Sequence, residues 1–128
     1  MKIASLIARI LLGVLFVFAG ANHLFNFFGK QPLPPGAAGQ FIGAMIDTGY
    51  MNFIGACEVI GGLLLLVNQF VPLGLTILGP LVINIFVVNA LMAPKGVPVA
   101  LVMILLWLIG AWRFRAAFFP LLRQKPPE

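Results

Sequence analysis

The stretch from Leu73 to Ala93, LGLTILGPLVINIFVVNALMA, carries no charged residue. A helix needs about 20 mostly apolar residues to cross a bilayer, and this segment has that length. Pro94 ends the segment, and Pro98 suits the first turn of the next one. Because the apolar run from Val97 to about Phe114 follows after so short a turn, we expect two antiparallel membrane-spanning helices here.

Two further apolar segments precede this pair, one at about residues 3–28 and one at about 51–70. The loop 29–50 between them is rich in proline at its start, and Gln40–Thr48 then places apolar side chains at helical spacing. The predicted fold is therefore all-α, an integral membrane four-helix bundle with a short interfacial helix in the first outer loop. The chain 1–128 is predicted to be a single transmembrane domain, with spans at about 3–28, 51–70, 73–93 and 97–114 and a tail at 115–128.

The composition excludes several classes of protein. Of the 128 residues, 62% are hydrophobic and 9% are charged, whereas an ordinary soluble domain has about 25% charged residues. This excludes a soluble enzyme, a nucleic-acid-binding protein and a disordered chain. A single cysteine, Cys57, excludes an internal disulfide, and with one histidine it predicts no metal site.

The basic residues predict the orientation. All Lys and Arg residues except Lys30 and Lys95 lie near the two ends of the chain, namely Lys2, Arg9, Arg113, Arg115, Arg123 and Lys125. By the positive-inside rule, both termini lie in the cytoplasm and the first loop lies outside. Arg9 is expected to extend its side chain toward the inner headgroups.

Polar residues inside the spans are the best pointers to a site, because burying them in hydrocarbon is costly. They are Asn22, His23 and Asn26 in the first span, Glu58 in the second, and Asn84 and Asn89 in the third. With midpoints near residues 19, 60 and 82, a rise of about 1.5 Å per residue places His23 about 6 Å, Glu58 and Asn84 about 3 Å, and Asn89 about 10 Å toward the outer side.

We therefore expect these six residues to form an intramembrane polar site around Glu58. Glu58 should face the interior, either protonated or paired with a donor such as His23. An imidazole beside a carboxylate can hold and pass a proton. The asparagines and His23 equally fit hydrogen bonds that only join helices, and no catalytic residue is assigned.

Three segments resemble the DoxX family of small four-helix bacterial membrane proteins. RILLGVLFVFAG (Arg9–Gly20) resembles its Arg-x-x-x-Gly-x-x-Phe-x-x-x-Gly opening, and EVIGG (Glu58–Gly62) resembles its Glu-x-x-Gly-Gly signature. The apolar run from Trp107 to Arg115 also fits. The resemblance implies a multi-pass protein of the bacterial inner membrane, linked through some members to quinone-linked oxidoreductases. Many members carry Lys at or beside the position of His23, which leaves the role of His23 open.

Three functions stay open at this point. The first is an accessory subunit or scaffold of a quinone-linked membrane oxidoreductase, without catalytic activity of its own. The second is a quinone- or lipid-binding protein with the His/Glu/Asn site, and the third is an oligomeric transporter or channel. The expected partners are the lipid bilayer, a membrane oxidoreductase and further copies of the chain, but no nucleic acid. No covalent or metal-held cofactor is expected, which leaves a quinone or lipid.

Overall fold

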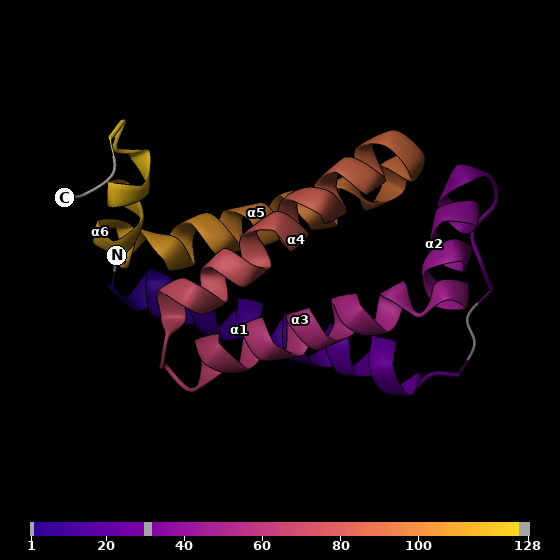
Figure 1. Cartoon of the computed structure of the whole chain (residues 1–128), viewed down its shortest axis with the longest axis horizontal. Coiled ribbons are helices and arrows are strands. Elements are labelled where there is room, and N and C mark those ends of the chain that lie inside the picture. The colour runs from indigo at the N-terminus through magenta and orange to yellow at the C-terminus, as the bar shows by residue number, and fades with distance from the viewer. Residues whose placement is uncertain (1, 30–31, 126–128) are drawn as a thin grey trace.

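The computed structural model describes residues 2–29 and 32–125, and within these residues it is helical without strands. Its long helices are α1 (Lys2–Phe25), α3 (Tyr50–Leu66), α4 (Val71–Met92) and α5 (Val97–Trp112). The short elements are α2 (Ala37–Thr48), η1 (Pro94–Gly96), α6 (Arg115–Phe118) and η2 (Phe119–Leu122). Both α1 and α4 pack against α3 and α5, so α1 and α4 lie diagonally opposite each other. The start of α1 and α6 lie at one end of the molecule, and α2 lies at the other (Figure 1).

The first two long helices end earlier than the apolar runs that predicted them. Helix α1 ends at Phe25 rather than Phe28, because Asn26 adopts a left-handed φ of 51° while its amide still donates to the Asn22 carbonyl. Helix α3 ends at Leu66 rather than Phe70, and Asn68 and Phe70 have positive φ. Asparagine tolerates this conformation and commonly ends helices, which an apolar count does not register.

Prolines set the boundaries of the last two long helices. Pro72 and Pro98 lie in the first turns of α4 and α5, and Pro94 directly follows the end of α4 in η1. Pro80 lies inside α4, where we predict a kink. Beside it, the Trp107 indole Nε1 donates to the Leu75 carbonyl at 2.9 Å and ties α5 to α4.

In the described part of the chain, three helical segments are long and apolar enough to cross a membrane, namely α1, α4 and Pro94–Trp112. Helix α3 has 17 residues and meets the same criterion only together with α2, from which it is bent by 86°. The bend falls at Gly49, whose φ of 81° is easily reached only by glycine. If α3 is counted, the described residues hold up to 4 spans, and α2 runs nearly perpendicular to α3.

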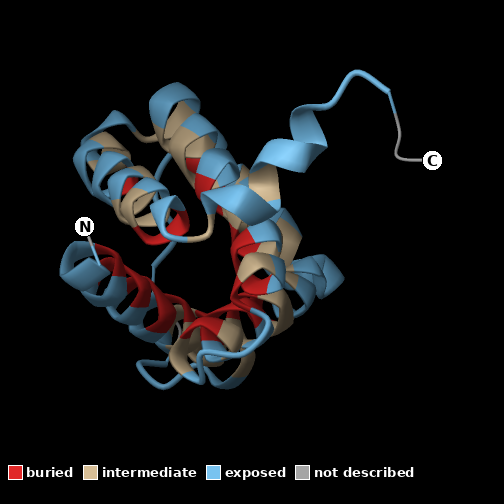
Figure 2. Cartoon of the chain, turned by 90° about the vertical axis from the view of Figure 1, so that its left-hand side faces the viewer, coloured by how far each residue is buried: buried red, intermediate tan, exposed pale blue. Residues whose placement is uncertain are grey.

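The side chains are distributed as in a membrane protein. The most buried large residues are Leu12 and Phe16 on α1, Leu65 on α3, and Leu75 and Leu78 on α4. Figure 2 shows the buried positions on the sides of the long helices that face one another. The outward sides remain apolar and exposed along all the long helices, which is the surface that lipid covers.

Candidate intramembrane polar site

Glycines bring α1 and α3 into backbone contact. Gly13 and Gly20 on α1 lie a heptad apart, as do Gly55 and Gly62 on α3. A Cβ added to Gly20 would lie 2.5 Å from the Gly55 carbonyl oxygen, and one added to Gly62 would lie 2.8 Å from the Gly13 oxygen. These distances are too short for any side chain, so the two helices can approach this closely only with glycine at these positions.

This approach brings His23 onto Glu58. A Cβ on Gly55 would lie 3.0 Å from the His23 Cβ, so His23 occupies the space beside that glycine. From there the His23 Nδ1 lies 3.1 Å from the Glu58 Oε1. The Glu58 side chain is 4% exposed and the His23 side chain 32%. The carboxyl group is therefore buried, whereas the imidazole that contacts it is partly exposed at the surface of the α1–α3 pair.

A hydrogen bond at this distance needs one proton between the two atoms. Either the His23 Nδ1–H donates to a carboxylate, or a protonated Glu58 donates to the ring nitrogen. In both arrangements the imidazole satisfies a carboxyl group that hydrocarbon would leave without a partner. The pair can therefore hold one proton in the part of the α1–α3 contact near the C-terminal end of α1.

The other expected site residues are placed differently. The Asn22 Oδ1 is buried and has no hydrogen-bond partner among the described residues. Asn26 is exposed and ends α1. The Asn89 Nδ2 donates within its own helix to the Ile85 carbonyl at 2.7 Å. Asn84 is exposed on the side of α4 that faces away from the bundle. The structure thus joins His23 and Glu58 by a hydrogen bond, and it shows none from Asn26, Asn84 or Asn89 to this pair.

Asn84 does not join the pair because of the direction in which its side chain points from α4, and not because of its depth in the membrane. The estimate from rise per residue places Asn84 at the height of Glu58, but a helix also turns by 100° per residue. The inward side of α4 is formed by Leu75, Leu78 and Val82, all buried. Asn84 comes two positions after Val82 and therefore points outward.

Two polar residues at the opposite end of α1 were not among the expected site residues. Arg9 is 8% exposed, and its Nη1 donates to the Leu65 carbonyl at 2.5 Å. Ser5 is buried, and its Oγ donates to the Ile109 carbonyl of α5 at 2.6 Å. The expectation that Arg9 reaches the headgroups is wrong in this structure, because its side chain is buried against the last turn of α3.

The sequence spacing of the buried residues of α1 indicates the buried position of Arg9. Ser5, Arg9, Leu12, Phe16 and Gly20 recur every three or four residues and are all buried. This periodicity puts Arg9 on the inner side of α1. The last carbonyls of a helix lack partners within it and carry the negative end of its dipole, so a guanidinium at the end of α3 is favourable.

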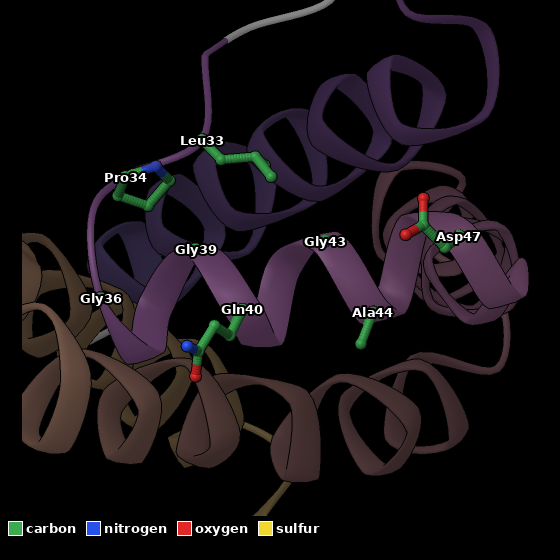
Figure 3. Close-up of a pocket in the computed structure, with 8 residues that line it drawn as sticks. All are labelled: Leu33, Pro34, Gly36, Gly39, Gln40, Gly43, Ala44 and Asp47. Carbon is green, nitrogen blue, oxygen red and sulfur yellow. The ribbon is translucent and has the colours of Figure 1, made fainter.

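Two concavities lie elsewhere on the described part of the chain. An open groove of about 590 Å³ runs along α2. In Figure 3, Leu33 and Pro34 lie on the loop that leads into the start of α2, and Asp47 lies at the far end of the helix. A smaller apolar groove of about 170 Å³ lies between α4 and α5 beside Trp107. Neither groove is lined by His23 or Glu58.

Apolar helices that join through a few buried polar contacts define a helical membrane protein. The chain matches the DoxX family over residues 4–93, which include both the Arg9–Gly20 and the Glu58–Gly62 segments. This protein belongs to the DoxX family.

A relative in Bacillus subtilis (strain 168), the uncharacterized protein YwoB, is 30% identical over 117 residues. The match covers 87% of this chain and 76% of that protein. No solved structure matches the chain. In residues 2–29 and 32–125, no group of three or more His, Cys, Asp or Glu side chains is arranged to hold a metal ion.

Proposed function

We propose that the chain is a multi-pass protein of the bacterial inner membrane, a bundle of four spans with both termini in the cytoplasm. The pairing of α1 and α4 with both α3 and α5 supports the bundle, with α3 counted as a span. The start of α1 and α6 lie together, and this end carries Lys2, Arg113 and Arg115 (Figure 1). Helix α2 would then lie along the outer surface of the membrane.

Within that membrane we propose that the protein is an accessory subunit or scaffold of a quinone-linked oxidoreductase system, without catalytic activity of its own. One observation carries the scaffold role. Thr76 and Asn89 donate within α4, but four polar contacts among the described residues of the spans join different helices of this chain. They are Arg9 to Leu65, Ser5 to Ile109, His23 to Glu58 and Trp107 to Leu75. These groups stabilise the bundle, and its outer faces remain available to a partner. The redox link rests on the family resemblance.

Native co-purification tests this proposal. The tagged full-length protein is extracted from its own membranes in a mild detergent, and co-purifying proteins are identified by mass spectrometry. We expect a membrane oxidoreductase in a defined ratio, retained when Glu58→Gln is used in place of the wild type. Glutamine keeps an acceptor for His23, so a scaffold role is not expected to depend on the acid. Purification of the chain without any oxidoreductase would contradict the proposal.

A second candidate is a binding site for a quinone or lipid headgroup at the outer end of the α1–α3 contact. The observation that favours it is the His23 imidazole, one third exposed, with the unpartnered Asn22 Oδ1 adjacent in sequence. A quinone carbonyl accepts a hydrogen bond from such a ring. Titration of a soluble quinone analogue into nanodiscs tests it. His23→Leu should weaken binding at least tenfold and Asn26→Leu should not, whereas equal affinity in all three proteins would exclude this site.

A further inference from the structure

The side of α4 that faces away from the bundle carries an amide that has no partner among the described residues. Asn84 lies near the middle of α4, is exposed, and makes no hydrogen bond to any described residue. The other polar side chain on this side, Thr76, donates to the Pro72 carbonyl of its own helix. In hydrocarbon no water satisfies an exposed amide, so a partner from outside the chain would remove the cost of leaving Asn84 without a hydrogen bond.

The residues around Asn84 have the spacing of a helix-packing stripe. Pro80, Asn84, Val87 and Leu91 follow one another at intervals of four, three and four residues, and all are exposed. We refer to these residues as the Asn84 stripe. This alternation is the spacing by which two helices pack side by side, and a single asparagine within such a stripe specifies register and partner. These four positions remain exposed although α2, α3 and α5 all contact α4.

We infer that a second copy of this chain packs against the Asn84 stripe and forms a two-fold dimer through α4. An asparagine side chain both donates and accepts, so two of them satisfy each other across a two-fold axis. Copies of one protein share one orientation in the membrane, and therefore their α4 helices run parallel when the axis is along the membrane normal. Each Asn84 then meets the other at the same depth. A lipid acyl chain covers the apolar part of the stripe but leaves the amide without a partner.

The neighbouring surface suits this arrangement. The apolar groove beside the stripe is lined by Gly79, Val82 and Ile83 of α4 and by Ile104, Trp107 and Leu108 of α5. It is continuous with the stripe through Ile83 and can receive an apolar side chain from the second copy. This inference is independent of the oxidoreductase proposal, because it concerns contact between identical chains.

Cysteine cross-linking locates the interface. In a Cys57→Ala background, Val87→Cys places a thiol on the stripe, and the control Val14→Cys places one on the exposed side of α1. Helices α1 and α4 lie diagonally opposite each other, so the two thiols lie on the exposed sides of two different helices. Oxidation in native membranes should link Val87→Cys into a species of twice the chain mass and leave Val14→Cys monomeric. Equal linking of the two variants, or a Val87→Cys product that contains a different protein, would overturn the inference.

A second experiment measures how much the Asn84 amide contributes to the affinity of the dimer. Fluorescence energy transfer between labelled copies reports dimerisation in liposomes at varied protein-to-lipid ratios. We expect Asn84→Ala to weaken the dimer about three- to thirty-fold. Asn84→Gln, which keeps the amide, should restore most of the affinity, and Thr76→Val should change nothing. A wild-type protein that is monomeric at every ratio, or an Asn84→Ala variant with unchanged affinity, contradicts the dimer. If Asn84→Ala fails to fold, the cross-linking pair still decides.

Discussion

At the scale of single residues, Glu58 is the most demanding group in the structure. Its carboxyl group is nearly inaccessible and lies within an apolar helix pair, and His23 at 3.1 Å is its partner. Removing one member of such a pair leaves a buried polar group unsatisfied, whereas replacing both by apolar groups is often neutral. Variants that replace one or both of these side chains by leucine therefore separate the contribution of the hydrogen bond from the cost of burying the polar groups.

We expect His23→Leu to lower the free energy of unfolding by about 3–5 kcal/mol, because Glu58 then has no partner. Glu58→Leu should cost less, since the partly exposed His23 can find another acceptor. The double variant should recover most of the loss. The free energy of unfolding is measured in detergent micelles for the two single variants and the double variant. Effects that add within about 0.5 kcal/mol would show that the two side chains do not interact.

At the scale of the helices, the α1–α3 contact depends on glycine. A Cβ at Gly20 would meet the Gly55 carbonyl oxygen, which cannot move without its helix. We predict that Gly20→Ala destabilises the protein by about 1–3 kcal/mol, the usual range for overpacking. Thermal unfolding in detergent measures this change.

Gly110 provides the matched control within α5. A Cβ there would have its nearest neighbour at 3.6 Å, the Arg9 amide nitrogen, which is ordinary contact. Because alanine favours helix by about 1 kcal/mol over glycine, Gly110→Ala should be neutral or slightly stabilising. If the two variants unfolded at the same temperature, close approach of α1 and α3 would not be a determinant of stability.

The helices illustrate what the sequence alone could predict. Apolar length and the prolines predicted the helical class and the turn between α4 and α5. The depth estimate put His23 and Glu58 at similar heights, and the two side chains are in contact in the structure. It failed for Asn84, because depth says nothing about direction around the helix axis. The glycines of α1 and α3 do not by themselves show which helices pair. That pairing depends on contacts between segments far apart in the chain.

At the scale of the whole molecule, a group of arginines lies at one end of the bundle and the acidic Asp47 lies at the other. Arg113, Arg115 and Arg123 follow α5, and Arg9 donates to the end of α3 from the same end of α1. Asp47 lies on α2 at the opposite end (Figure 1). Since basic residues are retained on the cytoplasmic side, this distribution predicts one orientation in the membrane.

Accessibility to a membrane-impermeant maleimide checks that orientation. In a Cys57→Ala background, Asp47→Cys should react in intact spheroplasts, because α2 faces outward in the proposed topology. Arg123→Cys should react only after the membrane is permeabilised. Both positions are exposed, so a difference in labelling reports the side of the membrane and not burial. Labelling of Arg123→Cys in intact cells, with Asp47→Cys protected, would reverse the topology while leaving the helix packing unchanged.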